Sequence, residues 1–282
     1  QFGIGDTSGM LTDAHELSNG NPVVSWEKCS KQNYGLELKM FDYRFSMVLD
    51  VFFEHRWDIL TTRNTLPSIT SVKLPLMNLG IVNNKGYELQ LGWNDKVGEF
   101  GYNINANMSF ARNKIIYKDE VIPNEPYMAE TGNSTGRFYG YMFDRFLQES
   151  DFDASGKIDP ELPTMAIGNP KPGDVLYKDL SGDGKVDGDD CTYFGWGTRP
   201  EYVFGVTAGL NWKGLSFSMQ WTGATHASRL LSGEYREPFG TTNSRALLQY
   251  LADGRYTTEN AENARFPRLT FNSKSHNYKL DS

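Results

Sequence analysis

The sequence predicts an all-β protein, an antiparallel transmembrane β-barrel segment with long extracellular loops. Three observations lead to this fold class: apolar and polar residues alternate strictly along several stretches, the polar phase is nearly uncharged, and tryptophans stand at both ends of the apolar phase. A period of two is typical of β-strands. Lipid on one side and a polar lumen on the other explain a polar face with few charges. The alternative is a soluble β-sandwich filled by the same aromatic side chains.

The first expected hairpin has its arms at residues 34–40 and 45–57 and its turn at 41–43. Its returning arm departs from strict alternation, because Val48 and Phe52 occupy the polar phase. These two side chains could contact something inside a barrel, or they could mark a soluble sheet with two buried faces.

Two more hairpins follow the same pattern. The second has arms at 87–93 and 100–110, with its turn in 94–99. The third has arms at 202–212 and 215–222, joined by the turn Lys213-Gly214. In its first arm Phe204, Val206, Ala208, Leu210 and Trp212 share one face, and Gly205, Thr207, Gly209 and Asn211 share the other. An alternating pair of runs around a two-residue turn predicts a β-hairpin.

The tryptophans give an independent signal. Trp93 and Trp212 lie in the apolar phase beside short turns, and Trp57 and Trp221 lie in the same phase at the far ends of their strands. Amphipathic rings at both ends of an apolar band are typical of the two membrane interfaces.

Composition agrees with this interpretation. Aromatic residues make up 13% of the 282 residues, and no run of about 18 apolar residues predicts a membrane helix. The net charge of −7 argues against nucleic acid as a partner. Cys29 and Cys191 lack metal-ligand spacing and are expected to be free thiols, although a disulfide stays open. About six spanning strands are expected, fewer than the roughly eight of the smallest bacterial barrels, so we expect residues 1–282 to be part of one larger barrel domain.

Loop lengths predict the orientation. The turns at 41–43, 94–99 and 213–214 are short, whereas the connections 58–85, 112–201 and 223–282 are long. Outer-membrane barrels have short periplasmic turns and long extracellular loops, so 112–201 and 223–282 are expected to be extracellular excursions. Strand parity then excludes a single membrane pass within 137–147, which is expected to lie in an excursion.

The chain resembles a known family, the SusC/RagA-type TonB-dependent transporters of Gram-negative outer membranes. The order and spacing of several motifs between about residues 21 and 270 carry the resemblance. They are Asn21-Pro22 through Lys28 with Gly35-Leu36-Glu37, Asn78 through Leu89, Phe138-Tyr139-Gly140-Tyr141, Lys171 through Asp190, Arg199 through Trp221, and Arg265-Phe266-Pro267-Arg268-Leu269.

The resemblance implies a large plugged barrel in the bacterial outer membrane, of about 22 strands, that imports nutrients. It implies a SusD-like surface lipoprotein as partner, TonB contacted through a segment not in this chain, and oligosaccharides or peptides as substrates, with glycan oligosaccharides preferred. The signal peptide, the plug domain and the final barrel strands of the family do not match any part of this sequence, so energy coupling is assigned to no residue.

Residues 179–190 follow the twelve-position calcium loop. Asp179, Ser181 and Asp183 occupy positions one, three and five, Lys185 offers a backbone carbonyl at seven, and Asp187 and Asp190 occupy nine and twelve. This spacing wraps six oxygens around one point, as calcium requires. No helix pattern flanks the loop, so a sensor role is not expected. The alternative is an Asp- and Gly-rich turn that binds no metal.

A weaker echo of the calcium pattern lies at 151–159, where position twelve is Leu162 instead of an acid. Both loops belong to the stretch 148–190, which carries eleven acids and four bases. The acidity of the chain is therefore concentrated there, either for cation binding or as a solvated surface.

Enzymatic chemistry finds little support. The four histidines are scattered, and the sequence has no nucleophile elbow, phosphate loop or zinc signature. We therefore expect no enzyme and no catalytic residue. Two alternative hypotheses remain. One is a soluble extracellular carbohydrate-binding β-sandwich with a dockerin-like calcium loop. The other is a secreted glycoside hydrolase, which needs two carboxylates facing a cleft, and the sequence alone does not identify such a pair.

Overall fold

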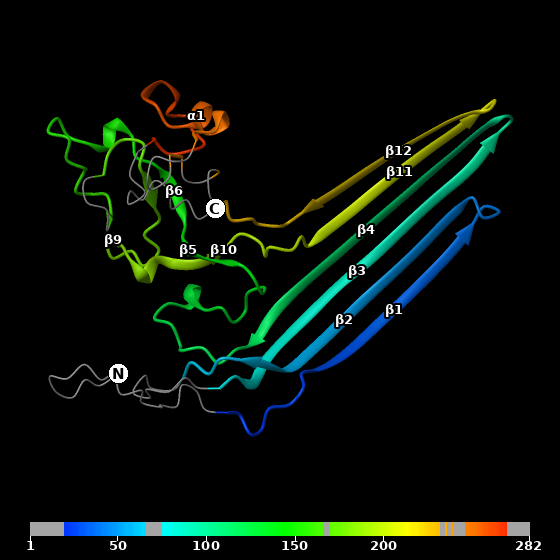
Figure 1. Ribbon diagram of the computed structural model, residues 1–282, viewed down its shortest axis with the longest axis horizontal. Coiled ribbons are helices and arrows are strands. Elements are labelled where there is room, and N and C mark those ends of the chain that lie inside the picture. Colours follow the sequence, from blue (N-terminus) through cyan, green and yellow to red (C-terminus); the bar gives the residue numbers. More distant parts are fainter. Residues whose placement is uncertain are drawn as a thin grey trace, which may run out of the picture.

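Six long strands form one antiparallel sheet in the order β1-β2-β3-β4-β11-β12, as Figure 1 shows. The structure is a computed structural model that describes residues 20–65, 75–165, 170–231, 235, 238–239 and 246–269. The strands are β1 (Lys28–Met40), β2 (Phe45–Thr61), β3 (Met77–Val97), β4 (Phe100–Tyr117), β11 (Tyr202–Trp212) and β12 (Leu215–Thr225). Each expected arm is therefore a strand of this sheet.

The three hairpin turns all lie at one end of the sheet (Figure 1). Lys213 and Gly214 have φ of 46° and 85°, as a type I′ turn requires. The turn between β3 and β4 is shorter than the expected 94–99, because pairing continues to Val97 and Phe100 and leaves only two residues between them.

The strands also extend further than their apolar alternation. β2 and β3 remain paired as far as Thr61 and Met77, so the connection after β2 is shorter than the expected 58–85. A bulge interrupts this pairing at Asp58, which has a φ of 57°. The Asn78 side-chain amide donates to the Asp58 carbonyl at 2.7 Å and holds the bulge. Backbone pairing thus continues where the side-chain pattern has ended.

The long segments carry only short elements. The strands are β5 (Phe138–Tyr141), β6 (Phe143–Phe146), β7 (Thr164–Met165), β8 (Val175–Tyr177), β9 (Lys185–Val186) and β10 (Cys191–Phe194). The helical turns are η1 (Pro126–Met128), η2 (Glu149–Asp151), η3 (Gly188–Asp190), α1 (Gln249–Gly254) and η5 (Thr258–Asn260). β5 and β6 pair with β10 and β8 outside the large sheet, as expected of a stretch that is no membrane pass.

A buried apolar cluster lies in the long segments and not against the sheet. Its members are Phe146, Val175, Tyr177, Val186 and Tyr256. We call residues 118–200 and 246–269 the loop unit. Arg268 donates to Asp174 at 2.7 Å and so ties the two parts of the loop unit together. The loop unit lies at the end of the sheet opposite the hairpin turns (Figure 1).

Phe52, which broke the expected alternation, lies across its strand partner Gly86. A Cβ added at Gly86 would lie 2.6 Å from the Phe52 ring. The aromatic ring fills the space that the glycine leaves, an aromatic–glycine pairing used across neighbouring strands. Among the described residues the other sheets have two strands each, and Phe52 packs within the large sheet, over Gly86.

Candidate functional site

The two faces of the large sheet differ in chemistry. Leu215, Phe217 and Trp221 on β12 are 70%, 56% and 53% exposed, although they are large and apolar. The strand register places them beside the apolar phase of β11, which continues into β4 and β3. Exposed apolar patches of this extent mark an interaction site in a soluble protein or a surface in contact with lipid.

The height of this apolar face fits a membrane. β11 is 11 residues long and apolar at every second position from Phe204 to Trp212. It pairs along its whole length with Phe100–Phe110 of β4. A tilted strand needs about 9–11 residues to cross the hydrocarbon layer. The apolar face therefore spans one membrane thickness.

The opposite face is an amide-rich surface. Asn103, Asn105 and Asn107 follow one another on β4 in the polar phase. Their side chains fold over glycines of neighbouring strands: a Cβ at Gly205 would lie 3.0 Å from Asn107 Oδ1, and one at Gly209 would collide with Asn103. The glycines thus give the asparagines room, which leaves an uncharged, hydrogen-bonding surface on β4 and β11. On β1 to β3 the same face carries the carboxylates of Glu37, Asp50 and Glu88.

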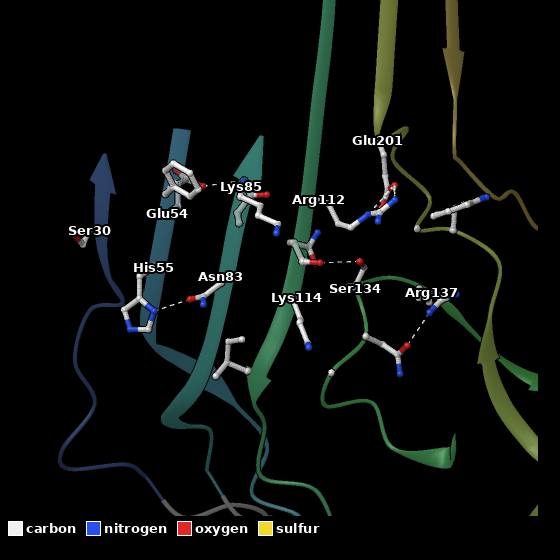
Figure 2. Close-up of a pocket in the computed structure, with 18 of the residues that line it drawn as sticks. Ser30, Glu54, His55, Asn83, Lys85, Arg112, Lys114, Ser134, Arg137 and Glu201 are labelled. Atoms are coloured by element: carbon white, nitrogen blue, oxygen red, sulfur yellow. Dashed lines mark hydrogen bonds and ion pairs between the residues drawn. The ribbon is translucent and has the colours of Figure 1, made fainter. Parts of the chain in front are cut away.

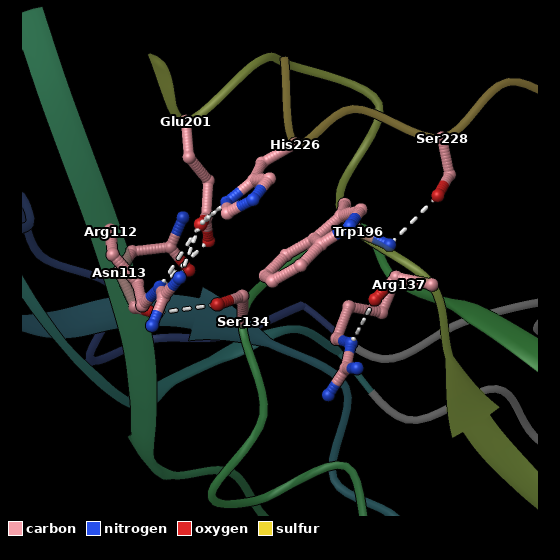
Figure 3. Close-up of polar contacts among 9 residues, drawn as sticks. Arg112, Asn113, Ser134, Arg137, Trp196, Glu201, His226 and Ser228 are labelled. Atoms are coloured by element: carbon pink, nitrogen blue, oxygen red, sulfur yellow. Dashed lines mark hydrogen bonds and ion pairs between the residues drawn. The ribbon is translucent and has the colours of Figure 1, made fainter.

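A cluster of polar and aromatic side chains closes the loop end of the sheet (Figure 3). The Arg112 guanidinium donates to both carboxylate oxygens of Glu201, at 2.9 Å and 2.6 Å. The Glu201 side chain is only 8% exposed. The guanidinium of Arg112 offsets the free-energy cost of burying the Glu201 carboxylate, and the bidentate geometry fixes the orientation of both side chains.

Two rings complete the cluster. The His226 ring stacks on Trp196 with centroids 4.0 Å apart and an interplanar angle of 2°. Its Nδ1 is buried and lies 3.4 Å from Glu201, without the geometry of a hydrogen bond. Arg112 also lies 5.4 Å from the centroid of Trp196. The cluster therefore joins β4, the entry to β11 and the exit from β12.

A cavity of about 630 Å³ opens beside this cluster (Figure 2). Strands β1 to β4 form one wall, and residues 132–134, Arg137 and Trp196 form the other. Ser134 donates to the Asn113 carbonyl at 2.7 Å, and Thr135 N–H donates to the Asn113 side chain at 2.7 Å, so the loop lies along β4. The cavity is lined by amides, hydroxyls and basic groups, together with the carboxylates of Glu54 and Glu201 and the apolar side chains of Phe53, Ile116 and Trp196.

The structure places the predicted calcium residues in a loop closed by its own backbone amides. Asp179 accepts from Gly182 and Gly184, Asp183 from Lys185, and Asp187 from Asp189. Asp190 is fully buried and accepts from Leu180, Ser181 and Asp187. Burial opposes its ionisation, but these amide donors outweigh burial and hold the pKa of Asp190 below its usual range.

The fit to calcium is therefore partial. Across the described residues no group of three or more His, Cys, Asp or Glu side chains is arranged to hold a metal ion. Ser181, Asp183, Lys185 and Asp187 are exposed, and Asp179 is partly exposed. Asp190 lies apart, inside the loop. Calcium binding remains a prediction.

In the second, weaker calcium-like pattern at 151–159, the first acid, Asp151, forms other contacts. Arg145 donates to Asp151 at 3.0 Å, and Gln148 N–H donates to it at 2.7 Å. Arg145 is the main reason that the pKa of Asp151 lies below its usual range. Asp151 therefore holds the start of η2 together.

Sequence reasoning missed the Arg112–Glu201 pair and the cavity. The two partners are 89 positions apart, and no local pattern links them. One sequence signal could have indicated the cavity. Arg112 and Lys114 are basic residues that follow the apolar residues of β4 in the same phase.

No helix among the described residues is both long enough and apolar enough to span a membrane. No family model matches the sequence. The chain is 27% identical over 278 residues to "TonB-dependent receptor P26" of Formosa agariphila. This match covers 90% of this chain and 27% of that protein. It is 26% identical to "TonB-dependent receptor P3" of the same organism, over 74% of this chain and 21% of that protein.

Solved structures give the same fold. The RagAB peptide importer in its "open-open" state matches with a TM-score of 0.60 and 21% identity, over 91% of this chain and 27% of that one. A second RagAB peptide transporter structure matches with a TM-score of 0.59, over 90% and 28%. The chain thus spans about a quarter of the length of these proteins.

These comparisons agree with the two-faced sheet and with the order of the motifs. The relatives are named as receptors and transporters, so the chain is not an enzyme. It is an all-β chain with a transmembrane barrel fold, and its place is the bacterial outer membrane. The chain is therefore similar to a fragment of the SusC/RagA-type TonB-dependent transporters, and its six long strands have the fold of part of such a barrel.

Proposed function

We propose that this chain forms part of the barrel wall of an importer that takes up nutrient oligomers across the outer membrane in a TonB-dependent way. The observation that carries the proposal is the sheet with an exposed apolar face one membrane thick and an amide-rich face behind it. The apolar face contacts lipid, and the amide-rich face lines the lumen.

The orientation follows from the two ends of the sheet. All three hairpin turns lie at one end and the loop unit lies at the other (Figure 1). Since barrels of this kind keep short turns in the periplasm, the loop unit faces the exterior. The excursions 112–201 and 223–282 then form the mouth of the transporter; of these, residues 166–169, 232–234, 236–237, 240–245 and 270–282 lie outside the described part of the chain.

We propose glycan oligosaccharides as the substrate class. The support is the uncharged part of the lumen face on β4, where Asn103, Asn105 and Asn107 present amide donors and acceptors suited to hydroxyl groups. Peptides are the second candidate, favoured by the likeness to the RagAB peptide importer. Peptides carry charged termini, which the uncharged asparagine row of β4 matches less well.

We propose a SusD-like surface lipoprotein as the partner that covers the mouth, and TonB as the partner on the periplasmic side, contacted outside this chain. The loop unit offers the outer partner a folded surface with its own buried cluster. Connections longer than about 12–15 residues are usually functional or disordered. Because the loop unit is folded, we expect it to be functional.

We also propose that a structural calcium ion binds the 179–190 loop. The support is the twelve-position spacing, the exposed carboxylates of Asp183 and Asp187, and the partly exposed carboxylate of Asp179. Extracellular modules bind calcium with dissociation constants of about 10⁻⁴–10⁻³ M, which suits a loop outside the cell.

The test is fractionation followed by uptake. The full-length transporter should sediment with the outer membrane and require detergent for extraction. A strain that lacks the gene should lose uptake of labelled oligosaccharides and keep uptake of labelled peptides. Loss of peptide uptake alone would favour the second candidate, and recovery from the soluble fraction would contradict the transporter.

A further inference from the structure

The apolar face ends in register across the sheet, and a basic belt takes its place. The last apolar row runs across neighbouring strands through Tyr34, Val51, Tyr87, Phe110 and Tyr202. It is rich in tyrosine, as expected where an apolar band meets water. The row is continuous, so it marks one depth along the barrel wall.

The next two rows of the same face are polar. The first contains Gln32, Phe53, Lys85 and Arg112, and the second contains Ser30, His55, Asn83 and Lys114. Three basic groups therefore stand within two rows, directly beyond the apolar face on its loop side. Phe53 keeps the first of these rows partly apolar.

Two of these charges have no acidic partner. Arg112 is neutralised by Glu201, but within the described part of the chain neither Lys85 nor Lys114 forms an ion pair. Glu54, on the strand next to Lys85, belongs to the opposite phase and is held there by Lys31 at 2.7 Å. The belt thus keeps an uncompensated positive charge.

The belt also lines the cavity of about 630 Å³ (Figure 2). His55, Asn83, Lys85 and Lys114 belong to its strand wall, and Ser134 and Arg137 to its loop wall. A volume of this size falls within the about 300–1,000 Å³ of small-molecule sites. The two carboxylates in its lining, Glu54 and Glu201, are paired with Lys31 and Arg112. The remaining amide, hydroxyl and ammonium donors suit the oxygens of a phosphate group.

The basic strand residues of the cavity belong to the phase of the lipid face, and Glu54, Asn84 and Asn113 of the other phase complete its lining. Lys85, Arg112 and Lys114 share the phase of Tyr87 and Phe110 on the lipid face, whereas the asparagine wall of β4 belongs to the other phase. A basic site just above the apolar band, on the outside of the barrel, lies at the depth of lipid headgroups.

We propose that this pocket binds the phosphate-bearing headgroup of an outer-leaflet lipid, whose acyl chains lie along the apolar face beneath it. The proposal rests on the orientation given under the proposed function. The continuity of the pocket with the apolar face selects a lipid over free phosphate, because only a lipid occupies both surfaces.

The test uses the full-length transporter in an uncharged detergent. Native mass spectrometry would count bound phosphatidylglycerol and, separately, bound phosphatidylcholine, which has no net charge. The variant carries Lys85→Gln and Lys114→Gln. The matched control carries Lys39→Gln and Lys157→Gln, which remove the same charge from exposed positions outside the pocket. Heat-modifiable migration of each variant confirms that its barrel has assembled.

We expect the pocket variant to bind phosphatidylglycerol about 30-fold more weakly, from about 1 kcal/mol for each lysine near an anionic surface. Phosphatidylcholine binding and the control should be unchanged, and inorganic phosphate should not displace the lipid. Equal phosphatidylglycerol binding by both variants overturns the proposal. Displacement by inorganic phosphate overturns it in favour of a free-anion site.

Loss of the co-purifying lipoprotein with lipid binding retained overturns the proposal as well, since the belt would then be a partner contact. These outcomes are separable from failure of the transporter itself. If the wild-type protein sediments with the outer membrane and imports its substrate, only the lipid site is rejected. If the wild-type protein is absent from the outer membrane, the proposed function falls first.

Discussion

At the scale of single residues, the two faces of the sheet set opposite rules for neighbouring positions. Ala208 lies on the apolar face in the middle of β11, between Ile104 and Met219 on the adjacent strands. Thr207, one position earlier, lies on the amide-rich face beside Asn105 and Gln220. A charged side chain at position 208 would therefore contact lipid, and one at position 207 would face the lumen.

Ala208→Arg should therefore block assembly, because arginine near the bilayer midplane costs about 2–4 kcal/mol. Thr207→Arg should assemble nearly as well as the wild type. The assembled fraction can be measured as heat-modifiable protein in outer-membrane preparations. Equal assembly of the two variants would contradict the assignment of the faces.

The Arg145–Asp151 pair predicts a pH dependence for the loop unit. Its hydrogen bonds to Arg145 hold the pKa of Asp151 below the usual value of about 3.9. The stability that the pair contributes is thus complete above that value and is lost as the pH falls through the lower folded pKa. Limited proteolysis of the loop unit between pH 6 and pH 3 should show this loss in the wild type.

Asp151→Asn should raise the protease sensitivity of 145–160 at pH 6 and reduce its further rise at low pH. Asp144→Asn is the control, since Asp144 is exposed. A wild-type and an Asp151→Asn protein with the same pH profile would exclude this pair as the cause.

At the scale of strands and loops, glycines set the contacts between β-strands. Gly86 has no room for a side chain, because a Cβ would collide with the Phe110 carbonyl and lie 2.6 Å from the Phe52 ring. Gly101 also lies in a strand, but a Cβ there would be 3.9 Å from Asn211, an ordinary contact.

Gly86→Ala should accordingly destabilise the barrel by about 1–3 kcal/mol, as overpacking typically does. Gly101→Ala should have little effect. Urea unfolding in detergent, followed by tryptophan fluorescence, measures both. A Gly86→Ala variant as stable as Gly101→Ala would show that the strands move apart at no cost.

The 179–190 loop predicts a calcium effect confined to one element. Removing calcium should loosen residues 174–195 and raise their protease sensitivity, and Asp183→Ala should do the same without chelator. Asp189→Ala is the matched control, since its side chain lies outside the six predicted ligand positions. If chelator leaves the protease sensitivity of the intact protein unchanged, the loop is a turn without metal.

The sequence predicted the strands where alternation was strict and failed where it was not. Residues 204–212 show the period without interruption, and their pairing and turn are as expected. The stretch from Met77 to Lys85 contains consecutive asparagines, so its strand appears only through backbone pairing with β2 and β4. The Arg112–Glu201 pair depends on contacts between distant segments, which a period of two does not encode.

At the scale of the whole molecule, the Arg112 cluster connects the wall to the mouth. Glu201 N–H donates to the His226 carbonyl at 3.1 Å, and Ala111 N–H donates to the Glu201 carbonyl at 2.9 Å. The strands that leave and re-enter the sheet on either side of the loop unit are thus fastened at one point. This point therefore joins the loop unit to the wall.

The arrangement of the whole molecule makes a last prediction about sidedness. Ser155 lies exposed in the loop unit, and Lys213 lies exposed in a short turn at the far end of the sheet. In a background with Cys29→Ser and Cys191→Ser, a membrane-impermeant thiol reagent should label Ser155→Cys on intact cells. Lys213→Cys should react only after the outer membrane is opened, because its turn faces the periplasm. Labelling of Lys213→Cys alone on intact cells would invert the topology, and the loop unit would then lie where no substrate or lipoprotein from outside could reach it.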